Sequence, residues 1–300
     1  MANLPPERLA ACPPFTYVGP DVFGPWSITT RRTRGGQAES KRWAIIFTCL
    51  SSRAVHIERF FALRGPAKQL QSDCGTNFIG ACKELGMDKT VQTYLSQQGC
   101  CWNFNPPHAS HMGGSWERMI GVARRILDSM LQQLKTRLTH EVLCTLMAAV
   151  TAVINARPLL PVSTDPQQPF ILSPALLLTQ KSGLPPPPGT FSDKDLYTKQ
   201  WRQVQALANQ FWTRWSKEYL SSLQQRHKWT VPRRNLEVGD LVLIRDKQMI
   251  RNCWPLAIVT ATFPGKDGRV RKVEVKTTNQ GSAKTFLRPV VELVLLLAKD

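Results

Sequence analysis

A run of four prolines is the feature that most constrains how this chain can fold. Residues 184–190 read Leu-Pro-Pro-Pro-Pro-Gly-Thr. Proline has a fixed φ and no backbone N–H, so this run predicts an extended spacer that cannot be helical. The sequence therefore predicts two domains over residues 1–183 and 193–300, joined by a linker over residues 184–192. With 300 residues, 42% of them hydrophobic, both parts can bury a core.

The first part is typical of an α/β domain that opens with antiparallel strands. Five β-rich runs are expected, over residues 15–23, 42–50, 53–58, 68–72 and 101–105. A polar hairpin tip, residues 29–41, separates the first two runs. Helices are expected over residues 77–86 and 91–98, from Ser115 onward, and from the N-cap Thr139 to a point before Pro158. The expected architecture is a mixed sheet with flanking helices.

The second part predicts one helix followed by a small, mostly β domain. Apolar and aromatic residues recur at helical spacing over residues 193–229, which is typical of a packing face. Four β-rich runs follow, over residues 240–245, 256–263, 270–277 and 285–294. Because these strands are short and separated by turns rich in Gly, Lys and Asp, they predict a small β-barrel.

The charge balance favours a polyanionic partner. Lys and Arg number 39 against 21 Asp and Glu, which gives a net charge of +18. Such a protein suits nucleic acid or an anionic membrane surface. No run of about 18 apolar residues exists, and prolines interrupt the first 25 residues where a signal peptide would need an apolar stretch. Nucleic acid is the better expectation, in an intracellular protein without a transmembrane segment.

Three acidic residues could hold divalent cations. Asp21 lies within an otherwise apolar β run, Asp73 follows the fourth run, and Glu117 lies early in the long helix. A carboxylate within a buried strand is costly unless it is paired or binds a cation. Enzymes that cleave or transfer phosphodiesters with two metal ions need several carboxylate ligands close together. On spacing alone, Asp73 could equally cap a turn, and Glu117 could equally stabilise the helix by interacting with the positive end of its dipole.

Long sequence motifs surround these three residues. They include Thr16-Tyr-Val-Gly-Pro-Asp21, Ser72-Asp-Cys-Gly-Thr-Asn77 and Gly113-Gly-Ser-Trp-Glu117, and the matching segments are residues 15–25, 47–58, 71–80, 104–121 and 154–159. At these residues the sequence resembles the integrase catalytic region of BEL/Pao-type long-terminal-repeat retrotransposons. Residues 201–289 resemble the C-terminal domain of the same polyproteins.

The resemblance implies a ribonuclease-H-like fold with an Asp-Asp-Glu triad, which maps onto Asp21, Asp73 and Glu117. These would be catalytic residues and ligands of two Mg²⁺ or Mn²⁺ ions. The implied reactions of this transferase are DNA 3′-end processing and strand transfer into target DNA. The implied partner is duplex DNA, the implied location is the nucleus after cytoplasmic passage, and a homo-oligomer is implied because two DNA ends are joined.

The sequence departs from the family in three ways, and the last of them keeps an alternative open. Pro20 directly precedes Asp21 in a strand that the fold would make central, where it removes one hydrogen-bond donor, so that a local bulge is expected there. Nothing before Asp21 offers the paired His and Cys of the family's N-terminal zinc-binding segment. Only residues 59–67 separate the third and fourth strands, whereas such crossovers usually need a dozen or more residues. We therefore expect difficulty in placing the fourth strand beside the first. The alternative is a truncated, non-catalytic remnant that only binds nucleic acid.

Basic and polar residues supply candidate contacts to nucleic acid. Around the triad these candidates are Asn77, His108, His111, Arg118, Arg124 and Arg125. The two histidines could instead cap the following helix or face solvent, and the arginines could simply form a solvated helix face. In the second part, cations alternate with buried-type valines, and the candidates are Arg271, Lys272 and Lys276. Among six cations of these strands we find one acid, Glu274, which favours a phosphate-binding face.

Overall fold

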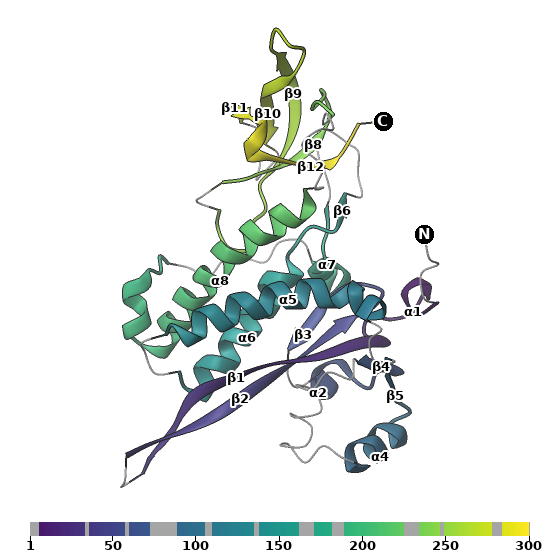
Figure 1. Cartoon of the computed structure of the whole chain (residues 1–300), viewed down its shortest axis with the longest axis vertical. Helices are drawn as coiled ribbons and strands as arrows, with labels where there is room; N and C mark the ends of the chain where they lie inside the picture. The colour runs from purple at the N-terminus through teal and green to yellow at the C-terminus, as the bar shows by residue number, and fades with distance from the viewer. Residues whose placement is uncertain are drawn as a thin grey trace. The chain divides into compact units, whose positions relative to one another are not determined.

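The computed structural model (Figure 1) forms two compact units, which we describe separately. The residues that the structure describes are 6–33, 36–57, 60–72, 89–105, 110–134, 138–161, 171–181, 189–224, 234–246, 249–277 and 284–299. Unit 1 comprises Met1–Asn155, Leu177–Gln180 and Pro188–Phe211. Unit 2 comprises Ala156–Leu176, Lys181–Pro187 and Trp212–Asp300. Most of the proline run lies outside the described residues, so the linker stays a prediction.

A five-stranded mixed sheet forms the centre of unit 1. Its strands are β1 (Tyr17–Thr33), β2 (Gly36–Cys49), β3 (Val55–Ile57), β4 (Gln69–Ser72) and β5 (Cys101–Phe104). Their order is β3-β2-β1-β4-β5. β1 and β2 pair antiparallel, as do β2 and β3, whereas β4 lies parallel to both β1 and β5. The five predicted β runs are thus confirmed, and β1 lies at the centre of the sheet.

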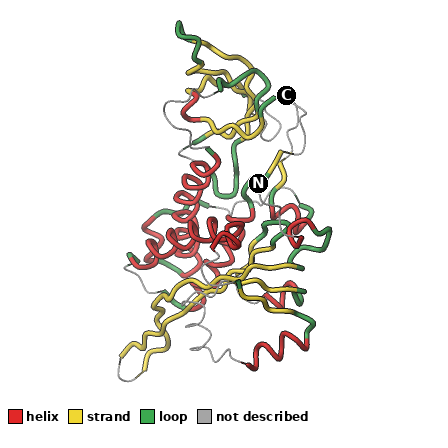
Figure 2. Tube along the Cα trace, turned by 45° about the vertical axis from the view of Figure 1, so that its right-hand side comes forward, coloured by secondary structure: helices red, strands yellow, loops and turns green. Residues whose placement is uncertain are grey.

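The first two strands are longer than predicted. Figure 2 shows β1 and β2 as a yellow two-stranded ribbon that extends beyond the rest of their sheet. The stretch that we predicted as a hairpin tip, residues 29–41, is largely strand. Its Thr, Arg and Ser residues show no apolar alternation, which is the pattern from which the other strands were predicted. The N–H of Thr29 donates to the carbonyl of Leu138 at 2.8 Å, which ties the ribbon to the loop after α5.

The short connection before β4 does not prevent its placement beside β1. A single helix, α2 (Phe60–Arg64), occupies it, and β4 then pairs with β1 through Tyr17↔Gln69 and Val18↔Leu70. Phe60 anchors α2, because its ring stacks on Phe47 with centroids 4.4 Å apart. Our expectation that the crossover is too short was therefore wrong.

Helices contact the sheet of unit 1, among them α4 (Lys89–Gln97), α5 (Ser110–Gln132) and α6 (His140–Asn155). The short helix α1 (Pro6–Leu9) belongs to the same unit, whereas α7 (Pro174–Thr179) is divided between the two units after Leu176. The predicted cap of α6 is confirmed, because Thr139 Oγ1 accepts a hydrogen bond from the N–H of Val142 at 3.3 Å. α5 begins five residues before the predicted start at Ser115, so Gly113 and Gly114 are helical.

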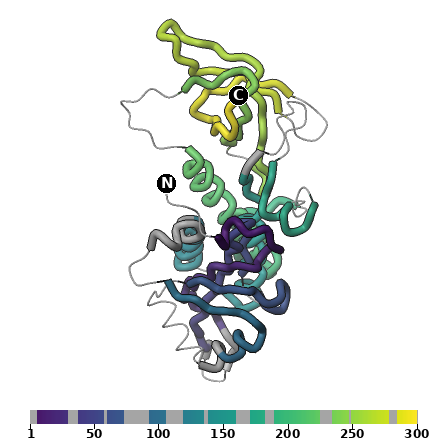
Figure 3. The backbone as a smooth tube through the Cα atoms, turned by 90° about the vertical axis from the view of Figure 1, so that its right-hand side faces the viewer, coloured from purple at the N-terminus to yellow at the C-terminus, as the bar shows by residue number. Residues whose placement is uncertain are grey.

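Unit 2 contains a five-stranded antiparallel sheet in the order β11-β10-β9-β8-β12. The strands are β8 (Leu241–Ile244), β9 (Leu256–Pro264), β10 (Val270–Thr277), β11 (Thr285–Pro289) and β12 (Leu293–Leu297). Figure 3 shows the β9–β10 hairpin, in light green, extending to its turn. The run predicted over residues 285–294 is divided by a 3₁₀ turn, η2 (Val290–Glu292). A two-stranded pair, β6 (Leu160–Pro161) with β7 (Ile171–Leu172), completes the unit.

The helix predicted over residues 193–229 is also divided. A 3₁₀ helix, η1 (Asp193–Tyr197), precedes α8 (Gln200–Leu223), because Thr198 between them is extended. The N-terminal half of α8 belongs to unit 1 and its C-terminal half to unit 2. Most of its predicted packing face is buried, including Phe211 and Trp215, whereas Trp201 is 51% exposed. Among the helices that the structure describes, none is both long and apolar enough to cross a membrane.

Candidate functional site

Asp21 lies in the central strand of the unit 1 sheet. It pairs with Ile46 of β2, is half-buried, and its Oδ1 accepts the N–H of Val22 at 2.7 Å. Alternation along the strand places Asp21 on the face that carries Phe23, away from Val22. Pro20 causes no bulge, because the register runs unbroken from Val18 to Phe23. The register shifts of this strand pair lie farther along β1, between Phe23 and Trp26 and between Thr29 and Arg32.

The face that carries Asp21 is the one that α5 covers. The rings of Phe23 and Trp26 meet edge to face with centroids 5.5 Å apart. Trp26 Nε1 then donates to Oδ1 of Asp128, in α5, at 3.0 Å. Figure 1 shows α5 crossing above β1. Asp21 therefore lies on the face of the sheet against which α5 packs.

The carboxyl ends of β4 and β5 meet beside β1. Ser72, the last residue of β4, is buried, and its Oγ accepts the indole N–H of Trp102 at 2.9 Å. Its carbonyl accepts the N–H of Asn105 at 2.8 Å. Gln71 Nε2 donates to Oδ1 of the same Asn105 at 3.0 Å. The chain is thus fixed up to the residue directly before Asp73.

Several predicted site residues cannot be placed. Asp73, Asn77 and His108 lie outside the described residues. Glu117, His111 and Arg118 lie in α5, whose backbone is described there, but their side chains are not. Among the described side chains, no three His, Cys, Asp or Glu residues gather as a metal site would need. The triad of Asp21, Asp73 and Glu117 therefore stays a prediction.

Arg124 and Arg125 lie farther along α5. Arg124 Nε approaches Oδ2 of Asp128 to 3.8 Å, with both side chains 32% exposed. Since Asp128 also accepts the indole of Trp26, this carboxylate joins the helix to β1. Arg125 is exposed. Of these two candidates for phosphate contact, Arg125 presents the more accessible cation.

Two arginines of the predicted basic face in unit 2 pair with acidic residues that lie outside the strands. Arg271 forms a bidentate pair with Asp267 of the β9–β10 turn, at 2.6 and 2.9 Å. The Arg271 guanidinium, with further hydrogen bonding from the N–H of Arg269, lowers the pKa of Asp267 to about 2. Arg288 lies 4.0 Å from Glu292. Each acid is four positions from its arginine in the sequence, and this spacing could have indicated the ion pairs.

Lys272 and Lys276 remain as exposed cations on β10. The ammonium of Lys272 lies 5.8 Å from the ring centroid of Phe263, which is 48% exposed. Lys272 pairs across the sheet with Phe263, and Glu274 lies between the two lysines on the same face. The alternating Val273 and Val275 are fully buried, as the pattern predicted. This face offers two cations and an exposed aromatic ring to a polyanion.

Comparison with known proteins gives limited matches. Residues 199–296 match a family described as "Family of unknown function (DUF5641)". No curated protein matches the chain. Among solved structures, the chain is similar to one in a simian T-cell lymphotropic virus intasome in complex with PP2A regulatory subunit B56 gamma. The TM-score is 0.37 at 9% identity, and the match covers 96% of this chain and 81% of that chain.

Proposed function

We propose that this protein is an integrase-like polynucleotidyl transferase of a BEL/Pao-type retrotransposon, with a ribonuclease-H-like catalytic domain. Asp21, Asp73 and Glu117 would hold two Mg²⁺ or Mn²⁺ ions for DNA 3′-end processing and strand transfer. The protein would act in the nucleus on duplex DNA. It would act as a homo-oligomer, because two element ends must be joined to one target.

The position of β4 is the observation that carries this proposal. A ribonuclease-H-like domain, which the sequence resemblance implies, needs the fourth strand beside the first. The sheet of unit 1 has that neighbour relation, with β4 parallel to β1 and β2 antiparallel to it. The register Tyr17↔Gln69 and Val18↔Leu70, continued by three residues, would bring position 73 beside position 21. This supports a shared site for Asp21 and Asp73.

The direction of α5 supports the assignment of Glu117 as the third metal ligand. Trp26 and Asp128 fix one point where β1 and α5 touch, and Figure 1 shows both elements running in the same general direction. From that point back to Glu117 is about 16 Å along the helix axis. From Trp26 back to Asp21 is about 14 Å along the strand, because the irregularity between Phe23 and Trp26 leaves only the four β2 steps from Arg42 to Ile46 beside this stretch. These similar distances support a position for Glu117 near Asp21.

The donor chemistry fits the metal ions. Three carboxylates are hard oxygen donors of the kind that Mg²⁺ and Mn²⁺ select. When bound, a metal pair activates the attacking oxygen and stabilises the leaving oxygen of a phosphodiester. The remaining task of the chain is to hold the DNA. For this we propose Asn77, His108, His111, Arg118, Arg124 and Arg125 near the triad, and Arg271, Lys272 and Lys276 in unit 2.

A strand-transfer assay tests the proposal. The full-length protein, Mg²⁺ or Mn²⁺ and a duplex with a terminal-repeat end should give joined products. Asp21→Asn, Asp73→Asn and Glu117→Gln should each abolish joining, while Glu39→Gln, which removes an exposed acid of β2, should not. Joining that survives Asp73→Asn and Glu117→Gln would refute the triad.

The alternative, a non-catalytic nucleic-acid-binding remnant, rested on the short connection before β4. Since β4 pairs with β1, that reason no longer favours it. It predicts salt-dependent duplex binding without metal-dependent joining. The same assay therefore separates the two functions, and cleavage without joining would instead indicate a nuclease.

A further inference from the structure

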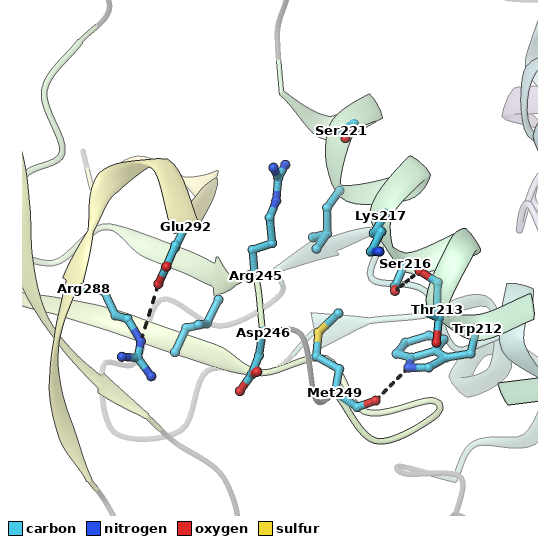
Figure 4. A pocket seen from close by; sticks show the side chains of 12 residues that line it. Trp212, Thr213, Ser216, Lys217, Ser221, Arg245, Asp246, Met249, Arg288 and Glu292 are labelled. Carbon is cyan, nitrogen blue, oxygen red and sulfur yellow. Dashed lines mark hydrogen bonds and ion pairs between the residues drawn. The ribbon is translucent and has the colours of Figure 1, made fainter. Parts of the chain in front are cut away.

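Unit 2 contains a cavity that the proposed integration chemistry does not use. It lies between the C-terminal half of α8, the segment that follows β8, and η2 (Figure 4). Its volume is about 680 Å³, within the range of roughly 300–1,000 Å³ that is usual for ligand pockets. Its walls come from three segments far apart in the sequence.

One side of the cavity is apolar and held in place. Trp212, Leu220, Ile244 and Met249 contribute to its lining. Trp212 Nε1 donates to the carbonyl of Met249 at 3.0 Å, which fastens the segment after β8 to α8. The Trp212 ring also meets Trp254 edge to face, with centroids 4.9 Å apart. An apolar side chain of a ligand would find a preformed surface here.

Arg245 lines the cavity, and its guanidinium group has a hydrogen-bond donor, Nε, without an acceptor among the described residues. Its backbone N–H donates to the carbonyl of Glu292 at 2.7 Å, which fixes its position at the end of β8. Its Nε is buried and has no hydrogen-bond partner among the described residues. One terminal nitrogen reaches Gln224 at a long 3.4 Å. In Figure 4 the Arg245 side chain extends alongside α8. Since a guanidinium carries five donors in a planar fork, a carboxylate would satisfy it well.

The charges around the cavity favour a single anionic group over a polyanion. Lys217, on α8, adds an exposed cation to the lining. Arg288 is paired with Glu292, and Asp246 also lines the cavity. The two acids would repel a continuous phosphodiester chain. They suit a peptide, whose backbone N–H groups can donate to carboxylates.

We propose that this cavity binds a short acidic peptide segment, in which a carboxylate neighbours an apolar side chain. The carboxylate would bond to the Arg245 fork with help from Lys217, and the apolar side chain would lie on the Trp212 surface. The site is separate from the face of Lys272 and Lys276 that we assign to DNA.

Fluorescence anisotropy with the full-length protein tests this site. The probe is a labelled hexapeptide of alternating Leu and Glu, and the reference is the same peptide with Gln in place of Glu. The Glu peptide should bind at least tenfold more tightly than the Gln peptide. Arg245→Gln should weaken its binding about tenfold or more. Lys266→Gln, which removes an exposed cation of the β9–β10 turn, should change it less than twofold.

Two results would overturn the proposal. One is equal binding of the Glu peptide by the wild-type protein and by Arg245→Gln, provided that circular dichroism shows both to be folded. The other is displacement of the peptide by a single-stranded oligonucleotide at equal charge concentration, which would make the cavity a nucleotide site. Arg245→Lys, which keeps the charge but loses the fork, should bind between wild type and Arg245→Gln.

Discussion

The side chain of Asn155 replaces a missing neighbour strand for Val55. Asn155 Nδ2 donates to the carbonyl of Val55, and Asn155 Oδ1 accepts its N–H, both at 2.8 Å. Val55 lies in β3, the edge strand of the unit 1 sheet, and Asn155 ends α6. Both residues are buried. One amide thus satisfies two backbone groups that an uncovered edge would leave unpaired.

Replacing Asn155 by Leu should destabilise the protein by about 2–4 kcal/mol, because two buried backbone groups lose their partners. Urea unfolding followed by circular dichroism measures this loss. Asn103→Leu, at an exposed position of β5, is the control and should change stability by less than about 0.5 kcal/mol. Equal stability of Asn155→Leu and wild type would show that the edge is satisfied in another way.

Phe60 should be the most sensitive residue of the short connection before β4. It is 3% exposed and contacts the rings of Phe15 and Phe47, with centroids 5.4 and 4.4 Å away. Phe60→Ala should cost about 3–5 kcal/mol through lost contacts and a cavity. The partly buried Phe61 provides the comparison. If Phe61→Ala costs as much in the same urea titration, Phe60 is not the anchor of α2.

Asp240 should make the stability of unit 2 depend on pH. Burial alone would raise the pKa of this fully buried carboxyl, but hydrogen bonds from Arg234 and from the N–H groups of Glu237 and Lys299 hold it below its ordinary value. Arg234 contacts both carboxylate oxygens, at 2.8 and 3.2 Å. Because the folded pKa lies below the unfolded value of about 3.9, the carboxylate stabilises the fold above about pH 4. This contribution disappears as the pH falls through the folded pKa.

Asp240→Asn measures that contribution. At pH 7 it should cost about 3 kcal/mol, and the difference from wild type should shrink below about pH 4. Glu237→Gln is the matched control, since Glu237 also pairs with Arg234, at 3.2 Å, but is 63% exposed. It should cost less than about 1 kcal/mol. A wild-type advantage that is constant from pH 7 to pH 3 would contradict the assigned pKa direction.

Asp267→Asn should strengthen binding of duplex DNA. It removes a charge that is ionised above about pH 2 and releases Arg271 from its bidentate pair. Lys276→Gln, by contrast, should weaken binding and reduce the slope of log K against log salt by about 0.9. Anisotropy with a labelled duplex at several salt concentrations measures both. Unchanged or weaker binding by Asp267→Asn would place the DNA on another surface.

The sequence predicted the strands and helices well where apolar periodicity is regular. The bounds of β10 are as predicted, because Val273 and Val275 alternate with charged residues. Prediction failed where polar residues form regular structure. The ribbon of β1 and β2 continues through a stretch of Arg, Thr and Ser, and α5 includes Gly113 and Gly114. In the ribbon, the backbone pairing of β1 with β2 outweighs the local preference of these residues.

The candidate sites were predictable to different degrees. A strand position for Asp21 follows from its apolar neighbours, and the pairing of Arg271 with Asp267 could have been inferred from their spacing. The cavity around Arg245 could not have been predicted from the sequence, because its walls come from α8, β8 and η2. The hydrogen bonds between Asn155 and Val55 could not have been predicted either, because the two residues are 100 positions apart. Such sites depend on tertiary contacts that a local pattern does not contain.

An anomalous-difference map from crystals soaked in Mn²⁺ tests the three-carboxylate site most directly. The proposed function predicts two peaks about 4 Å apart, in contact with the carboxylates of Asp21, Asp73 and Glu117. Peaks that disappear in the Asp73→Asn variant would support the assignment further. A map in which Asp73 points away from Asp21 and Glu117, with no metal between them, would contradict it.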